Sequence, residues 1–342
     1  MNPASDLPWL AEPLANALRQ QRGHALLVYG PTGVGQFEFA VMLARAWLCE
    51  TANDQRAAGL ACGQCASCHL VDARGHPDLR VLLPEALEEA LGWASDEPPE
   101  ESGEGKRRQP SKEIRVGQVR AALQFSELTR GRSRHKVVIA YPAERMNAIA
   151  ANALLKTLEE PPPGQRFVLA TEAADRLLPT VRSRCQAVRL ELPVRDVALH
   201  WLAGQKVAQP EVLLAAAGGS PLLARDWELA GVDSATWAAL PGGVRRGDAS
   251  VLSGWPVPRA VDALQRVCHD ALSLAAGGQP RFFAGLRPAP GAQLSELLAW
   301  SRELSRVARH AEHPWNAGLL IEALVTQGRD ALGGDPGQRG RR

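Results

Sequence analysis

The chain has 342 residues, of which 45% are hydrophobic and 22% are charged, and its formal net charge at pH 7 is +2. These values are typical of a soluble globular protein of two or three domains, and the charge is too small to argue for nucleic-acid binding by itself. No apolar run approaches the roughly 18 residues of a membrane span, and the N-terminus lacks a signal-peptide pattern. We therefore expect a cytoplasmic protein with no membrane partner.

A glycine-rich loop between a strand and a helix organises the first half of the chain. The apolar run 26–29 leads into Gly30-Pro31-Thr32-Gly33-Val34-Gly35, and a helical pattern starts at Gln36. This order is that of a P-loop, in which converging backbone N–H groups and a helix N-terminus bind phosphate. Gly30, Gly33 and Gly35 fit a tight turn without a Cβ in the way of a ligand, and are the candidate nucleotide-binding residues.

The residues that would supply ATPase chemistry are missing. Gln36 stands where the pattern G-x-x-x-x-G-K-[ST] has its lysine, and Phe37 stands where a hydroxyl would hold Mg²⁺. After the buried-strand run 137–140, Tyr141 and Pro142 occupy the places of the Asp-Glu pair of an active ATPase of this type. We expect no ATP hydrolysis by this chain. Two alternatives stay open: weak nucleotide binding through the remaining N–H groups, or a glycine loop that is purely structural.

Four of the six cysteines cluster after this helix. Cys62, Cys65 and Cys68 form two C-x-x-C steps, and Cys49 ends the preceding helix. Such turns let thiolates converge on one ion, and four thiolates form the closed tetrahedral shell of structural zinc. We predict one structural Zn²⁺ with no open position for catalysis. Uncoordinated reduced thiols are the alternative, and a disulfide is less favoured because nothing indicates an oxidising compartment.

An acidic segment follows the next short strand run. From Glu85 to Glu104 there are eight acidic residues and no basic one, and Pro98 and Pro99 lie among them. Such a composition cannot bury enough apolar surface to offset the entropy lost on ordering. We predict a disordered surface insertion over about residues 85–110, with a functional acidic segment as the less favoured alternative.

A basic segment precedes the strand run 137–140. Between Thr129 and Lys136 the sequence reads TRGRSRHK, which is dense in positive charge. Contact with phosphate is one interpretation. A solvated turn is the other and is favoured by the local sequence alone, because charged residues of this kind are common on exposed loops.

Strands alternate with helices over residues 24–190, which predicts a parallel α/β sheet. After residue 192 the strand signals stop. Short helical patterns follow, and longer ones cover residues 261–276 and 294–309. The last ten residues, 333–342, read as a flexible basic tail.

The motifs of the chain resemble those of bacterial clamp-loader AAA+ subunits. The similarity rests on GPTGVG, the four-cysteine set, IRVGQVR, NALLKTLEEPP, FVLAT and SRC, in this order. It implies a P-loop AAA+ module over residues 1–190 with a zinc module at 49–68. A small helical lid at 191–235 and an all-α collar at 236–332 would follow. In this family five subunits form an open ring that uses ATP to open a sliding clamp and place it on primed DNA.

The resemblance also implies partners. They are ATPase subunits of the gamma/tau type and a delta subunit in a hetero-pentamer, with the sliding clamp and primer-template DNA reached through the complex. Close active relatives carry GKT and DE where this chain has GQF and YP. The chain therefore resembles the non-hydrolysing type of subunit, within a DNA polymerase III holoenzyme.

One catalytic residue is implied as well. For Arg184, in Ser183-Arg184-Cys185, the local sequence alone favours a surface salt bridge. In clamp loaders, however, the arginine of the SRC motif points at the ATP of the adjacent subunit. Arg184 is therefore the candidate catalytic residue, acting in trans as an arginine finger.

Two rival interpretations belong to other classes of protein. One is a catalytically active AAA+ ATPase with a divergent P-loop, but without a lysine and an Mg²⁺ ligand the γ-phosphate charge has little to stabilise it in the transition state. The other is a zinc-bearing nucleic-acid-binding protein outside any motor. It is weakened by the supply of only two tyrosines and six phenylalanines for an aromatic platform.

Overall fold

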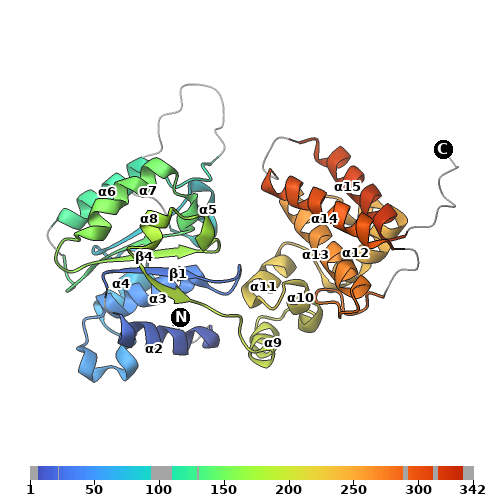
Figure 1. Cartoon of the computed structure of the whole chain (residues 1–342). Helices are drawn as coiled ribbons and strands as arrows, with labels where there is room; N and C mark the ends of the chain where they lie inside the picture. The colour runs from blue at the N-terminus through green and yellow to red at the C-terminus, as the bar shows by residue number, and fades with distance from the viewer. Residues whose placement is uncertain are drawn as a thin grey trace. The chain divides into compact units, whose positions relative to one another are not determined.

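The computed structural model describes residues 7–21, 23–93, 110–128, 131–287, 292–310 and 315–333 (Figure 1). The chain divides into two compact units, Met1–Pro193 and Val194–Arg342. The boundary lies close to the expected end of the P-loop module at residue 190. In the described part of the chain, no helix combines the length and the apolar character needed to cross a bilayer.

A five-stranded parallel sheet forms the centre of the first unit. Its strands are β1 (Ala25–Tyr29), β2 (Leu79–Leu82), β3 (Lys136–Ala140), β4 (Gln165–Thr171) and β5 (Gln186–Arg189). They lie in the order β2-β3-β4-β1-β5, and every neighbouring pair is parallel. The sheet confirms the α/β class expected from the alternation of strands and helices. Four of the five strands coincide with apolar runs because a parallel sheet covered on both faces buries nearly every side chain.

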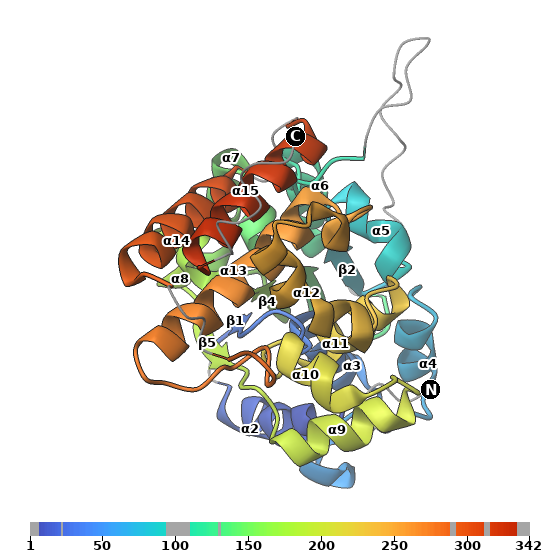
Figure 2. The same ribbon diagram turned by 90° about the vertical axis from the view of Figure 1, so that its right-hand side faces the viewer.

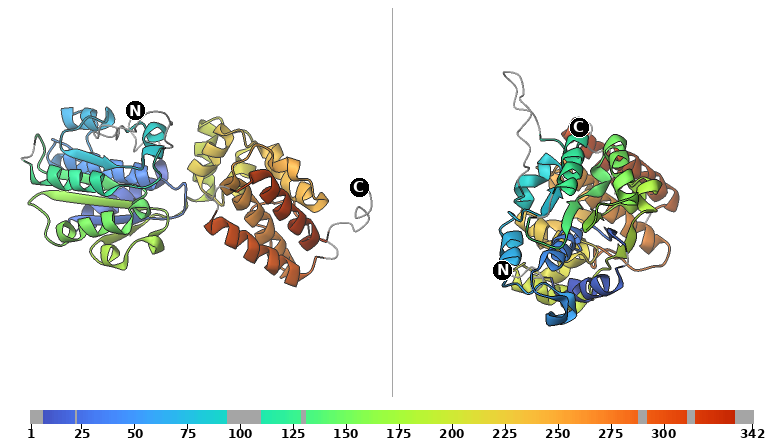
Figure 3. Two further views of the ribbon diagram at one scale, coloured as in Figure 1. Left: turned by 90° about the horizontal axis from the view of Figure 1, so that it is seen from above. Right: turned by 90° about the vertical axis from the view of Figure 1, so that its left-hand side faces the viewer.

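Helices cover both faces of this sheet. On one face lie α6 (Val116–Glu127) and α7 (Ala148–Glu159), and on the other lies α3 (Gln36–Leu48), against which α2 (Ala11–Gln20) packs (Figures 1 and 3). One buried cluster joins Leu27 and Phe167 of the sheet to Val119 of α6 and Leu154 of α7. Side chains of a strand alternate between faces, so the next residues along each strand face α3.

The prediction of a disordered insertion over residues 85–110 is wrong for the first residues of that segment. Glu85–Leu91 form helix α5, whose glutamates in the first turn complement the helix dipole and whose C-cap Gly92 has a φ of 64°. Ser111 on the far side of the segment donates its backbone N–H to Glu85 Oε2 at 2.8 Å. Alanine and leucine between the glutamates have high helix propensity, which a count of the charged residues alone does not take into account. The rest of the predicted insertion, residues 94–109, lies outside the described residues.

The second unit is helical throughout its described residues (Figure 2). Its helices are α9 (Arg195–Gly204), α10 (Pro210–Ala216), α11 (Pro221–Leu229), α12 (Ser234–Arg246), α13 (Val257–Ala275), α14 (Leu294–Arg309) and α15 (Ala317–Ala331). One core runs through it, in which Trp237 stacks on Phe283 with ring centroids 4.9 Å apart and Trp300 is 2% exposed. This core spans both expected domains: Trp227 belongs to the expected lid, and most of the other members belong to the expected collar. The division into lid and collar at residue 235 stays a prediction.

Candidate functional site: a P-loop, a four-cysteine cluster and Arg184

The glycine loop joins β1 to α3, as the sequence predicts. Gly33 and Gly35 have φ values of 77° and 103°, which place them in the left-handed region that favours glycine. Gly30 is required for a different reason, because a Cβ there would lie 2.5 Å from the carbonyl oxygen of Leu190, the residue after β5. Trp9, in the N-terminal turn Pro8–Leu10, donates its indole N–H to the carbonyl oxygen of Val34 at 2.8 Å. The loop is therefore held from both sides by the protein itself.

Gln36 ties the loop to its own helix. Its side chain is 2% exposed, and Nε2 donates to the carbonyl oxygens of Gly30 and Pro31, each at 2.8 Å. A lysine at this position would instead present a mobile cation to bound phosphates. The amide carries no charge, and its donors are used inside the loop.

Aromatic rings occupy the positions where magnesium ligands are missing. The ring of Phe37 lies 5.2 Å from that of Tyr141 and 6.4 Å from that of Trp93, measured between centroids. The Tyr141 hydroxyl donates to Glu172 Oε1 at 3.1 Å, and Thr32 of the loop donates to the other oxygen of Glu172 at 2.9 Å. Burial, and then the negative charge of Glu172, raise the pKa of Tyr141, so the phenol stays neutral. An acidic group bonded to the loop disfavours a polyphosphate there.

The sequence alone does not reveal that Trp93 and Trp9 contact the P-loop region. Trp93 lies after α5, in the acidic segment expected to be disordered, and it packs edge-on against Phe37. A large aromatic residue among glutamates is the one signal that could have indicated an ordered contact, because such side chains dominate the energetics of packing.

The four clustered cysteines converge on one point. The Sγ atoms of Cys49, Cys62, Cys65 and Cys68 all lie within 4.8 Å of one another. The sulfur atoms of Cys49 and Cys65 are 3.9 Å apart, and those of Cys62 and Cys68 are 4.0 Å apart. Four thiolates about 2.3 Å from a tetrahedral zinc ion would be about 3.8 Å apart. The arrangement can hold a metal ion, and none of the six cysteines forms a disulfide bond.

Backbone amides surround these sulfur atoms. The N–H groups of Gln64 and Cys65 both donate to Cys62 Sγ at 3.4 Å, and that of Cys68 donates to Cys65 Sγ at 3.4 Å. A hydrogen bond from Thr51, together with those amides, lowers the pKa of the Cys62 thiol to about 6. Burial raises the pKa of Cys68, the innermost of the four. Donors aimed at sulfur stabilise thiolates, which are the metal-binding form.

The remaining two cysteines are placed apart from this cluster. Burial raises the pKa of Cys185 to about 12 and that of Cys268 to about 12. Both therefore remain protonated at neutral pH. Neither is a member of the four-cysteine group, as the sequence predicts.

A polar network, part buried and part exposed, connects the cysteine cluster to the basic loop. Glu50, next to Cys49, accepts a hydrogen bond from Ser67 at 2.9 Å and forms an ion pair with Arg132 at 3.1 Å. Asp78 is 1% exposed and accepts the backbone N–H groups of Gly131, Arg132 and Ser133 at 2.7, 2.8 and 2.9 Å. Burial by itself would raise the pKa of Asp78, but these three donors hold it below the ordinary value. Asp78 thus fixes the backbone of the loop.

Replacing Asp78 by asparagine should cost about 2–3 kcal/mol of stability, because a charged acceptor of three hydrogen bonds is lost. Since the folded-state pKa of Asp78 is lowered, its contribution is fully present above the unfolded value of about 3.9 and is lost as pH falls through the folded value. Urea unfolding of Asp78→Asn at pH 7 measures the loss. The matched control is Asp262→Asn, whose carboxylate is 42% exposed in an ion pair with Arg266 and should cost less than about 1 kcal/mol. Equal losses for the two variants would contradict the assignment.

Arg184 lies after the short helix α8 (Pro179–Arg182), directly before β5. Its Nε donates to Glu159 Oε1 at 2.7 Å, and Nη1 donates to the carbonyl oxygen of Thr180 at 2.8 Å. The side chain is 31% exposed, and that of Glu159 is 49% exposed. The surface salt bridge favoured by the local sequence is therefore present in this chain. An exposed pair of this kind is worth only about 0–1 kcal/mol, so a stronger anion could replace Glu159 as the partner.

The strand order, the glycine loop between β1 and α3, and the helices on both faces of the sheet define a P-loop α/β module of the AAA+ type. Residues 8–193 match the family model described as "DNA polymerase III, delta subunit". The chain belongs to the family of DNA polymerase III delta' subunits.

Two relatives named as delta' subunits agree with this assignment. The DNA polymerase III subunit delta' of Pseudomonas aeruginosa is 40% identical over 60% of this chain and 56% of its own length. That of Escherichia coli is 32% identical over 76% of each chain. A solved structure, described as a DNA polymerase III gamma subunit-related protein from Thermotoga maritima, is 18% identical. It covers 94% of this chain and 99% of its own, with a TM-score of 0.46.

Proposed function

We propose that this chain is a non-hydrolysing subunit of the bacterial sliding-clamp loader within DNA polymerase III holoenzyme, where it helps to load the clamp onto primed DNA. Membership of the delta' family supports this role. Its partners would be ATPase subunits of the gamma/tau type and a delta subunit in a hetero-pentamer. The sliding clamp and primer-template DNA would be reached through that complex.

One observation carries the non-hydrolysing part of the proposal: the Nε2 of Gln36 is bonded to the carbonyl oxygens of Gly30 and Pro31. The amide that replaces the catalytic lysine is used to close the loop. Phe37 and Tyr141 pack against each other where Mg²⁺ would need oxygen ligands. Phosphoryl transfer depends on positioning and on neutralising charge, and this chain lacks both the lysine of the P-loop and the magnesium ligands expected at positions 37, 141 and 142. Gly30, Gly33 and Gly35 then keep the turn, and nucleotide binding is weak or absent.

We further propose that the four cysteines hold a structural Zn²⁺. Their mutual distances and the amides directed at their sulfur atoms fit this ion. All four positions of the shell are filled by protein, so the zinc would contribute to folding and take no part in chemistry. Arg184 would act in trans on the ATP of the neighbouring subunit.

The isolated chain should show no significant ATPase activity, and Gln36→Lys alone should not create it, because the magnesium ligands would still be absent. Steady-state hydrolysis at saturating ATP and Mg²⁺ measures this. Turnover at the rate of working P-loop ATPases, abolished by Gly35→Val, would overturn the proposal in favour of an active ATPase with a divergent P-loop.

The clamp-loader role itself is tested by reconstitution: the chain should co-purify with gamma-type and delta subunits, and clamp loading should fail when it is left out.

A further inference from the structure

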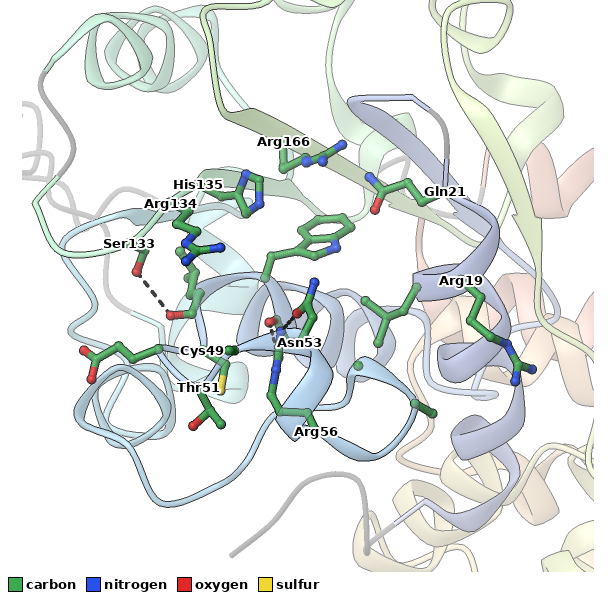
Figure 4. A pocket seen from close by; sticks show the side chains of 18 of the residues that line it. Arg19, Gln21, Cys49, Thr51, Asn53, Arg56, Ser133, Arg134, His135 and Arg166 are labelled. Carbon is green, nitrogen blue, oxygen red and sulfur yellow. Dashed lines mark hydrogen bonds between the residues drawn. The ribbon is translucent and has the colours of Figure 1, made fainter.

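A cleft of about 480 Å³ opens in the first unit, away from the P-loop (Figure 4). Its walls come from the end of α2, the end of α3, the segment after Cys49, the loop 131–135 and the start of β4. Loop 131–135 leads into the amino end of β3, whereas the P-loop follows the carboxyl end of β1. In a parallel sheet the amino ends of the strands lie on one side of the sheet and the carboxyl ends on the opposite side, so the cleft and the P-loop are separate sites.

The lining of the cleft is strongly basic. It includes five arginines and His135, against one acidic residue, Glu50; the arginines are Arg19, Arg56, Arg132, Arg134 and Arg166. Arg56 donates to the carbonyl oxygen of Ala46 at 2.7 Å, and Arg166 donates to that of Gly23 at 2.8 Å. Backbone oxygens orient a guanidinium without neutralising it. Burial lowers the pKa of Arg166, which marks a cation that is partly removed from water.

An aromatic surface lies among these cations. Trp47, at the end of α3, is half-buried and lines the cleft. The guanidinium of Arg166 is 5.8 Å from the centroid of its ring. Nucleobases stack on tryptophan and on arginine planes. A volume of about 480 Å³ is in the range that small-molecule sites occupy.

The basic loop is held in place before any ligand arrives. Asp78 binds three successive backbone N–H groups of residues 131–133, and Glu50 binds Arg132. Figure 4 shows Arg134, His135 and Arg166 along one side of the cleft, with Asn53 and Arg56 across from them. A fixed set of cations loses little entropy on binding, which favours an anion of matching size.

We propose that this cleft binds a nucleoside phosphate, with the phosphate against the arginines of the 131–135 loop and the base beside Trp47. The ligand is either a free nucleotide or the terminal nucleotide of a DNA strand, which present the same chemistry. For the loop TRGRSRHK, this favours phosphate contact over a solvated turn. The inference does not depend on the clamp-loader role.

The test is isothermal titration of the full chain with dAMP, deoxyadenosine, inorganic phosphate, and single-stranded DNA with and without a 5′-phosphate. We expect saturable binding of dAMP or of 5′-phosphorylated DNA, at least about tenfold tighter than that of deoxyadenosine or inorganic phosphate alone. Binding of dAMP identifies a free nucleotide as a ligand, and binding only of the phosphorylated strand identifies its end. Equal binding of inorganic phosphate and dAMP, or no saturable binding by any probe, would overturn the proposal.

Variants locate the binding. Arg134→Glu should weaken it at least about tenfold, because it replaces a charge-assisted hydrogen bond by repulsion. Trp47→Leu should weaken it about five- to tenfold, and Trp47→Phe should keep it, since the ring is retained. Arg120→Glu, on α6 at the other face of the sheet, is the matched control and should change it less than twofold. Thr32→Asp, which adds a negative charge to the P-loop, should also have no effect. Loss with Thr32→Asp but not with Arg134→Glu would place the ligand in the P-loop and disprove the assignment.

Discussion

A clamp-loader complex reconstituted with Arg184→Ala should assemble normally yet hydrolyse ATP and load clamps more slowly than the wild-type complex. The guanidinium would offset charge on the γ-phosphate of the neighbouring subunit, and such fingers are worth roughly 10³–10⁵-fold in GTPases. The loss should be smaller here, because in the proposed complex the ring would have several ATP sites and this chain would serve one. Arg184→Lys should rescue poorly, since an ammonium cannot reproduce the planar fork.

The salt bridge with Glu159 supplies the decisive control. Glu159→Gln removes the ion pair but keeps Arg184, so it should leave both rates near the wild-type values. Arg182→Ala, which removes an exposed arginine two residues earlier, should do the same. If Glu159→Gln slows both reactions as much as Arg184→Ala does, the arginine acts through this surface pair. Unchanged rates with Arg184→Ala would remove the finger from the proposal altogether.

Protein purified without chelator should contain about one equivalent of zinc, and the double variant Cys62→Ser with Cys65→Ser should contain none. Structural zinc contributes about 10–16 kcal/mol in small zinc-finger peptides, so its loss should unfold the segment around residues 49–68. We expect a marked fall in the thermal midpoint of the first unit. Elemental analysis and thermal unfolding measure the two effects.

The other cysteines provide the matched control for the zinc experiment. The double variant Cys185→Ala with Cys268→Ala should keep the full metal content, because both thiols are protonated and lie outside the cluster. Any destabilisation it causes reports the cost of truncating one partly buried and one buried side chain. Zinc retained after Cys62→Ser with Cys65→Ser would rule out the four-cysteine site.

Sequence patterns predict the first unit well because its elements have strong local signals. The helix predicted to begin at Gln36 does begin there, since the positive φ of Gly35 ends the loop. Apolar runs fix β1, β3 and β4 for a similar reason, because both sheet faces are covered.

The second unit shows where local signals fail. Helix α12 contains Pro241, Gly242 and Gly243, residue types that disfavour a helix locally. It forms nevertheless, with Trp237 and Val244 buried in the core. A Cβ at Gly243 would lie 2.4 Å from a methyl group of Val251, so this glycine admits a neighbouring turn. Tertiary packing here outweighs helix propensity.

Site residues divide in the same way. The cysteine spacing predicts a cluster, because C-x-x-C turns are local. The hydrogen bonds of the Gln36 amide and the cleft around Trp47 depend on segments that are far apart in the sequence. Short motifs contain no information about such contacts, which appear only once the sheet is assembled.

The contact between Gly30 and β5 has a consequence for how such proteins diverge. A Cβ at position 30 would strike the carbonyl oxygen of Leu190 at 2.5 Å, and Leu190 donates its N–H to Tyr29 at 2.7 Å. Selection for an intact fold is therefore enough to retain this glycine after selection for ATP turnover has ended. A side chain at positions 36 and 37 meets no comparable clash with the backbone, and the structure buries a glutamine and a phenylalanine there. If selection for catalysis is relaxed, we therefore expect the lysine of the loop to be lost while the glycine is retained. A retained first glycine is then poor evidence that a protein of this family still binds nucleotide.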